Sequence, residues 1–199
     1  GGTYDAALAQ QLVALVCSLR GSVCLYQGEE LGLTEADVPF EALQDPYGIT
    51  FWPNFKGRDG CRTPMPWTGE ANGGFSGARP WLPVPAEHGE LSVAAQDARA
   101  DSVLNGVRHL LRWRKGHPPL VTGDIAFLDA DEPVLAFTRR AGGDALLAVF
   151  NLSSMPQKWD VPTALRVADV LDDHGLRAGV ADGRVVQLPP RGVFYARLG

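Results

Sequence analysis

The sequence FKGRDGCRTPMPW, residues 55–67, holds a dense group of side chains that could bind a polar ligand. Arg58 and Arg62 flank Asp59, with glycines and prolines around them. Glycine permits tight or left-handed turns and proline fixes φ, so this composition indicates a stiff loop. Guanidinium groups offer several fixed donors, and a carboxylate accepts from neighbouring hydroxyls. Such a loop suits a sugar ring, and it suits equally an arginine–aspartate latch that only pins the loop.

Two adjacent glutamates, Glu29 and Glu30, form a second candidate group, because they follow a short apolar run at residues 22–26. That run lacks alternation, which favours a strand buried on both faces, as in a parallel sheet. In parallel α/β folds, sites are built at the C-terminal ends of such strands. Neighbouring residues of a strand point to opposite faces, so these carboxylates cannot easily face each other across the roughly 5–9 Å that a catalytic pair needs. We expect one glutamate to pair with a loop arginine and the other to be solvated.

Helices are predicted before and after these groups. The first covers residues 5–20, so that helix and strand together make half of an α/β unit. The second covers residues 101–115, with Asp101 as N-cap and basic side chains near the negative end of the helix dipole. Residues 28–97 contain no long regular element but many aromatic side chains, in which disordered segments are poor. We therefore expect an ordered, packed loop between the helices.

After Leu120 the pattern changes to short apolar runs divided by Asp-Glu-Pro and Gly-Gly-Asp. Several short strands at regular spacing predict an antiparallel β-domain. The predicted fold class is therefore α/β followed by all-β. We assign residues 1–118 to the α/β part and residues 119–199 to an antiparallel β-sandwich.

Composition and motifs argue against several classes of protein. A net charge of −5 with scattered basic residues argues against a nucleic-acid partner. The three cysteines form no CxxC pair and the four histidines no HxxxH arrangement, so we expect no disulfide framework and no metal site. Phosphate-loop and dinucleotide fingerprints are absent from the sequence, and we expect no cofactor. The apolar stretches are too short to span a bilayer and no signal-peptide pattern is visible, so we expect a cytoplasmic protein without a membrane partner.

Three motifs in this order resemble one known family: SLRGSVCLYQGEELGL, LQDPYGITFWPNFKGRDGCRTPMPW and SVLNGVRHLLRWRKGHPPL. They look like the C-terminal third of an α-glucosidase of the α-amylase family (glycoside hydrolase family 13), in its α-glucosidase and oligo-1,6-glucosidase branch. The resemblance implies the last part of a (β/α)₈ barrel: helix seven, strand eight, a long loop on the active-site face, and helix eight. The terminal strands would be the family's small C-terminal β-domain.

The family's reaction is retaining hydrolysis of terminal α-glucosidic bonds of short oligosaccharides, by an aspartate nucleophile, a glutamate acid/base and a further aspartate. In the family these carboxylates lie on strands four, five and seven, so the resemblance implies no catalytic residue in this chain and no activity for the chain alone. Arg58 resembles the arginine that helps to hold the non-reducing glucose. Arg62, Asp59 and Glu35 are further candidates for shaping the substrate pocket.

Two other functions fit the same sequence. A trehalose synthase or sucrose isomerase would be a transglycosidase on the same scaffold, and a non-catalytic sugar-binding or interaction module would need no catalytic carboxylates. If the chain is one third of a barrel, its partner is the rest of the same enzyme. An isolated third would expose wide apolar faces, so we expect the chain alone to oligomerise, to swap elements between copies, or to be a proteolytic remnant of a longer protein.

Overall fold

The computed structural model describes residues 3–199, which divide into two compact units. The first, here called the loop unit, comprises residues 3–6 and Tyr26–Asn105. The second, here called the sheet unit, comprises Ala7–Leu25 and Gly106–Gly199. No helix among the described residues is both long and apolar enough to cross a membrane.

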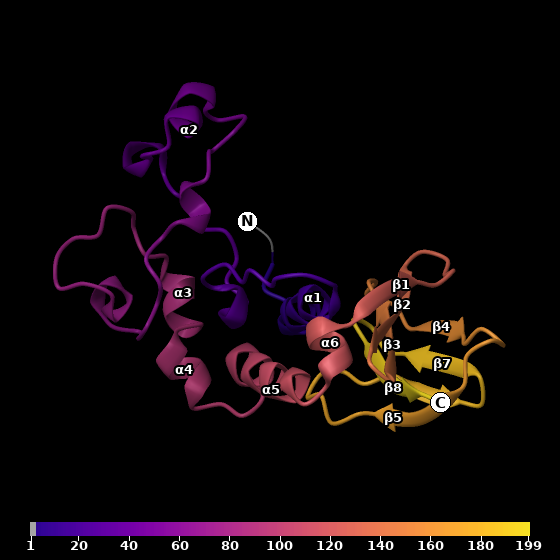
Figure 1. Cartoon of the computed structure of the whole chain (residues 1–199). Coiled ribbons are helices and arrows are strands. Elements are labelled where there is room, and N and C mark those ends of the chain that lie inside the picture. The colour runs from indigo at the N-terminus through magenta and orange to yellow at the C-terminus, as the bar shows by residue number, and fades with distance from the viewer. Residues whose placement is uncertain (1–2) are drawn as a thin grey trace. The chain divides into compact units, whose positions relative to one another are not determined.

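The sheet unit is built from two antiparallel sheets and the helices beside them (Figure 1). Five strands pair in the order β1 (Asp124–Phe127), β2 (Val134–Ala141), β3 (Asp144–Asn151), β8 (Val193–Leu198) and β5 (Val167–Leu171). Three more pair in the order β4 (Gln157–Asp160), β7 (Val185–Leu188) and β6 (Val180–Asp182). The predicted antiparallel strands after Leu120 are confirmed.

One apolar core joins the two sheets, because alternate residues of each strand point to the same face. Val149 of β3 and Phe194 of β8 share this core with Trp159 of β4 and Leu188 of β7. The two sheets therefore pack face to face as a sandwich. The assignment of residues 119–199 to a separate domain stays a prediction, since the sheet unit also contains two longer helices.

Those helices are α1 (Ala6–Ser18) and α5 (Val103–Lys115), and the short α6 (Pro118–Thr122) follows them. The Ser18 hydroxyl lies 2.7 Å from the Tyr195 hydroxyl of β8, and the Trp113 ring of α5 lies 4.9 Å from the Tyr195 ring. Helices α1 and α5 therefore contact the five-stranded sheet through Tyr195. This residue points away from the sandwich core, because it follows the core residue Phe194 on β8. Both long helices were predicted from the sequence, to within two residues at each end.

The strand predicted at residues 22–26 is not formed in this structure, where these residues belong to no helix or strand. A β-strand exists only when a neighbouring strand supplies hydrogen bonds. No described strand pairs with residues 22–26. An apolar run without alternation is therefore insufficient to make a strand by itself.

The loop unit contains only short helices, as expected for residues 28–97. They are η1 (Glu29–Leu31), η2 (Phe40–Ala42), α2 (Pro46–Phe51), η3 (Asp59–Cys61), η4 (Ala71–Gly74), α3 (Ala86–Glu90) and α4 (Val93–Asp97). Small apolar clusters hold them, one around Leu82 and Val38 and another around Leu31 and Leu104.

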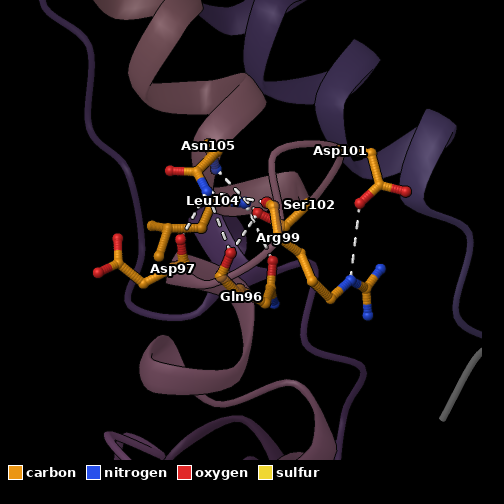
Figure 2. Close-up of polar contacts among 7 residues, drawn as sticks. All are labelled: Gln96, Asp97, Arg99, Asp101, Ser102, Leu104 and Asn105. Carbon is orange, nitrogen blue, oxygen red and sulfur yellow. Dashed lines mark hydrogen bonds and ion pairs between the residues drawn. The ribbon is translucent and has the colours of Figure 1, made fainter.

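A polar network within this unit surrounds its last residues, 96–105, where α5 begins (Figure 2). The buried Gln96 side chain accepts from the Leu104 N–H at 3.0 Å and donates to the Leu31 carbonyl at 2.8 Å. The Ser102 hydroxyl accepts from the Asn105 N–H at 3.2 Å, so Ser102 caps the helix. Asp101, the predicted N-cap, instead lies 3.6 Å from the Arg99 guanidinium, because the helix begins two residues after it.

Candidate functional site

Asp45 anchors the stretch that the sequence singled out. Its Oδ1 accepts from the Tyr47 N–H at 2.9 Å and so caps α2, while its Oδ2 accepts from the Arg58 N–H at 3.0 Å. The same Oδ2 lies 3.6 Å from Nη1 of Arg62. The hydrogen bond from the Arg58 backbone is the main cause that holds the pKa of the Asp45 carboxyl below its usual range. One nearly buried carboxylate thus ties both ends of the Arg58–Arg62 segment to α2.

Asp59 makes a second tie in the same segment. Its side chain is fully buried, and its Oδ2 accepts from the N–H groups of Gln44 at 2.6 Å and Asp45 at 2.8 Å. Charge-assisted bonds to two consecutive backbone donors are strong and directional. The Asp59 carboxylate therefore faces the loop's own backbone, and any effect on a ligand would act through the loop's shape.

Gly57 and Gly60 allow the arginine segment to lie close to Asp45 and to residues 35–36. Gly57 has φ of +75°, and a Cβ there would lie 2.9 Å from Cβ of Asp45. A Cβ on Gly60 would lie 2.4 Å from the Ala36 carbonyl oxygen, which is below any ordinary contact. The Gly60 carbonyl accepts from the Ala36 N–H at 3.0 Å. Glycine at position 60 thus allows the arginine segment to lie directly on residues 35–36.

The guanidinium of Arg58 remains free on this stiff support. Its side chain is exposed and makes no hydrogen bond or ion pair with any part of the chain that the structure describes. The Arg62 side chain is 39% exposed beside Asp45. Asp45, Asp59 and Arg62 therefore form a latch within the loop, and the Arg58 guanidinium takes no part in it.

A small cavity of about 110 Å³ adjoins the segment. The exposed Glu35 lines it together with Gly60 and Cys61, and polar and apolar side chains complete the wall: Tyr26, Gln27, Glu29, Leu33, Thr34, Thr63, Met65 and His88. Glu35 is therefore brought beside the segment that carries Arg58, Asp59 and Arg62. The role of all four residues in binding substrate stays a prediction.

The expectation that Glu29 or Glu30 pairs with a loop arginine is wrong. Glu29 accepts from the Tyr26 N–H at 3.1 Å, and Glu30 accepts from the Gly28 N–H at 2.9 Å. Each carboxylate closes a turn of its own segment, since residues 27–32 form turns and the short η1 helix instead of a strand end.

Asp45 was missed from the sequence, although a signal for it was present. An aspartate directly before Pro46 is a common start of a helix, with the aspartate as N-cap and the proline at N1. Among the described residues no group of three or more His, Cys, Asp or Glu side chains is arranged to hold a metal ion.

This chain is similar to known proteins both in sequence and in structure. Residues 2–123 match the family model described as "Alpha amylase, catalytic domain". A probable α-glucosidase of Rhizobium meliloti (strain 1021) is 45% identical over the whole chain, which covers 35% of that protein. A crystal structure of the α-glucosyl transfer enzyme XgtA superposes on all of the chain with a TM-score of 0.94 and 50% identity, over 37% of XgtA. The isomaltulose synthase of Klebsiella sp. LX3 superposes on 97% of the chain with a TM-score of 0.81 and 25% identity, over 38% of that enzyme. The chain thus spans about a third of the length of the relatives that it matches.

Proposed function

Because the chain belongs to the α-amylase family, we propose that it forms part of a retaining α-glucosidase that cleaves terminal α-glucosidic bonds of short oligosaccharides. The chain spans about a third of its relatives, so this activity would belong to the longer protein. The observation that carries the proposal is the free Arg58 guanidinium on a frame fixed by Asp45 and Asp59. A donor that is held in place before substrate arrives loses little entropy on binding.

In this proposal the chain supplies the last part of the catalytic barrel. Helix α1, residues 22–26 and helix α5 would be its seventh helix, eighth strand and eighth helix, and the loop unit would be the eighth loop. Residues 119–199 would be the small C-terminal domain. The order of elements along the chain supports this assignment, as does the match of residues 2–123 to the family model. Strand eight of a closed barrel would find its partners in strands that lie outside this sequence.

Arg58 would donate to hydroxyl groups of the non-reducing glucose. Arg62, Asp59 and Glu35 would shape the pocket, the first two by fixing the loop and Glu35 from the wall of the adjoining cavity. A retaining glycosidase needs two carboxyl groups about 5–5.5 Å apart across the scissile bond. We place those groups outside this chain, and the chain alone would be inactive.

The test is the anomeric configuration of the first product. The natural full-length protein is given p-nitrophenyl α-glucoside, and the released glucose is followed by proton NMR before it mutarotates. We expect α-glucose at first, because retention requires two inversions. Release of β-glucose would rule out a retaining enzyme, and the absence of turnover would favour the non-catalytic, sugar-binding alternative.

A second candidate function is transfer of the glucosyl group to a sugar, as in a trehalose synthase or sucrose isomerase. It is favoured by the 50% identity to a structure described as an α-glucosyl transfer enzyme. Hydrolysis and transfer share the first step and differ in whether water or a sugar hydroxyl completes the second. Product analysis on maltose and on sucrose separates them: monosaccharides without any new glycoside indicate a hydrolase, a longer oligosaccharide indicates transfer, and an isomeric disaccharide indicates an isomerase.

A further inference from the structure

A second cavity of about 220 Å³ lies in the loop unit and includes none of the four candidate residues. Its wall combines one tryptophan with charged and amide side chains, namely Glu41, Ala42, Gln44, Asn72, Arg79, Pro80, Trp81, Pro83 and Val84. Pockets for drug-sized molecules measure roughly 300–1,000 Å³. A cavity below that range suits a ligand about as large as a single ring.

Trp81 is presented to this cavity by a rigid segment. Its neighbour Leu82 is fully buried in a small apolar cluster with Val38 and Leu43. Pro80 and Pro83 restrict the backbone on both sides. Trp81 itself is 59% exposed, so much of its indole ring is open to a ligand in the cavity that it lines. Leu82 thus anchors the segment in the interior, and the Trp81 indole ring lies on the surface.

Charged side chains of opposite sign border the same cavity. Glu41 and Arg79 are both exposed, and neither side chain makes a hydrogen bond or ion pair with the described chain, nor does the Trp81 indole N–H. The Asn72 amide donates to the carbonyls of Ser76 at 3.0 Å and Ala78 at 3.2 Å, and so holds the turn that leads to Arg79. A ligand here meets one free carboxylate and one free guanidinium.

This pair of charges restricts the ligand. An anion attracted by Arg79 is repelled by Glu41, and a cation is affected in the opposite way. A neutral polyhydroxy ring satisfies both, since its hydroxyls accept from a guanidinium and donate to a carboxylate. Its C–H face can cover the indole ring and remove apolar surface from water.

We propose that this cavity is a saccharide-binding pocket that holds one hexose unit against Trp81, with Arg79 donating and Glu41 accepting. The pocket binds and does not cleave. The proposal stands on these residues alone, so it does not depend on turnover by the longer protein.

The experiment is a titration of the ¹⁵N-labelled 199-residue chain with maltose and, separately, with isomaltose. The sequence has five tryptophans, and the Trp81→Ala variant identifies the Trp81 indole N–H resonance by its disappearance. We expect either sugar to shift this resonance in a saturable way. Tetramethylammonium and inorganic phosphate serve as charged probes, and we expect neither to reproduce the shift.

Variants then locate the site through backbone amide shifts of residues 41–44 and 79–84. Trp81→Ala weakens sugar binding by about tenfold or more, because the buried apolar face is lost. Arg79→Ala weakens it as well and leaves the Trp81 resonance as a reporter. Trp67→Ala, which removes another half-exposed tryptophan outside the cavity, leaves the affinity unchanged.

The proposal is overturned if neither sugar shifts the Trp81 resonance, if phosphate or tetramethylammonium shifts it while the sugars do not, or if affinity survives in both Trp81→Ala and Arg79→Ala. These results are independent of the glucosidase test, since no bond is cleaved in the titration. A chain that binds sugar here while the longer protein fails to hydrolyse glucosides would sink only the proposed activity.

Discussion

Asp45 shows how a single carboxylate decides what its neighbours can do. It accepts from the backbone of Tyr47 and Arg58 and faces Arg62, so only one of the two loop arginines keeps a free guanidinium. The sequence predicted a stiff polar loop at residues 55–67, because glycine, proline and arginine are dense there. It could not assign the roles of the two arginines, because that depends on a residue thirteen positions before Arg58.

Gly60 gives a direct test of this packing at the level of one residue. Gly60→Ala should lower the free energy of unfolding by roughly 1–3 kcal/mol, because its Cβ would meet the Ala36 carbonyl and force the backbone apart. The matched control is Gly77→Ala, where no atom lies within 4 Å of the new Cβ and the change should stay within about 0.5 kcal/mol. Urea denaturation followed by tryptophan fluorescence measures both. Equal stability of the two variants would mean that residues 36 and 60 do not pack as described.

At the scale of elements, Arg139 ties α1 to the five-stranded sheet. It lies on β2 and is fully buried, and its guanidinium donates to the carbonyls of Ser18, of Leu19 at 2.8 Å and of Gly123 at 2.8 Å. These include the last carbonyls of a helix, which have no partner within the helix. The side chain thus replaces missing helix bonds and carries positive charge to the negative end of the dipole.

Arg139→Met should therefore destabilise the protein by about 3 kcal/mol or more, because several buried carbonyls lose their donor at once. The control is Arg140→Met, the next residue on the same strand, whose side chain is exposed. Its effect should stay within about 0.5 kcal/mol. Thermal melts of both variants would decide the matter, and an Arg139→Met protein as stable as the control would contradict the described role.

His174 is a buried residue that links the strands to α5. Its Nδ1 accepts from the Leu176 N–H at 3.1 Å, and its ring lies edge-on to Trp113 of α5 and Tyr195 of β8. The titratable groups that act on it are Asp172 and Asp173 on its own turn and His109 on α5. Burial is the main cause that lowers the pKa of His174 to about 4, although the two aspartates act in the opposite direction.

The lowered pKa of His174 makes the free energy of unfolding depend on pH. The unfolded chain takes up a proton near pH 6.5 and the folded one only near pH 4, so stability is full above pH 6.5 and falls as the pH drops toward 4. The loss should reach about 3 kcal/mol. His174→Asn keeps an acceptor near the Nδ1 position and removes the titration, so its stability should change less over this range. Equal losses in the two proteins, measured by urea denaturation at several pH values, would assign the acid sensitivity to other groups.

Helices and antiparallel strands were predictable because their signals are local. The apolar spacing and flanking residues of α1 and α5 lie within the helices, and each hairpin carries its own turn, such as Gly142–Gly143 between β2 and β3. Residues 22–26 failed because a parallel strand depends on partners far away in sequence. The burial of His174 could not be predicted for the same reason, because its surroundings come from three separate segments.

For the whole molecule, the exposed apolar surface has consequences for association. On α1 the side chains of Leu12 and Val16 are 48% and 42% exposed and lie one turn apart. We expect the 21.4 kDa chain to show a larger, concentration-dependent mass by light scattering. The double variant Leu12→Glu, Val16→Glu should shift it toward the monomer, and Val180→Glu, a change at an exposed residue of β6, should not. A monomer at all concentrations would contradict this expectation.

We propose that Arg58 binds substrate in an enzyme whose catalytic carboxylates lie outside this chain. The most direct measurement is the kcat/KM for p-nitrophenyl α-glucoside of three proteins: the natural full-length protein, its Arg58→Ala variant, and the 199-residue chain alone, with Arg140→Ala as control. We predict an active full-length protein, a loss of about 10-fold to 100-fold for Arg58→Ala from a missing charged hydrogen bond, and no turnover by the chain. Turnover by the chain alone, or full activity of Arg58→Ala, would contradict the claim.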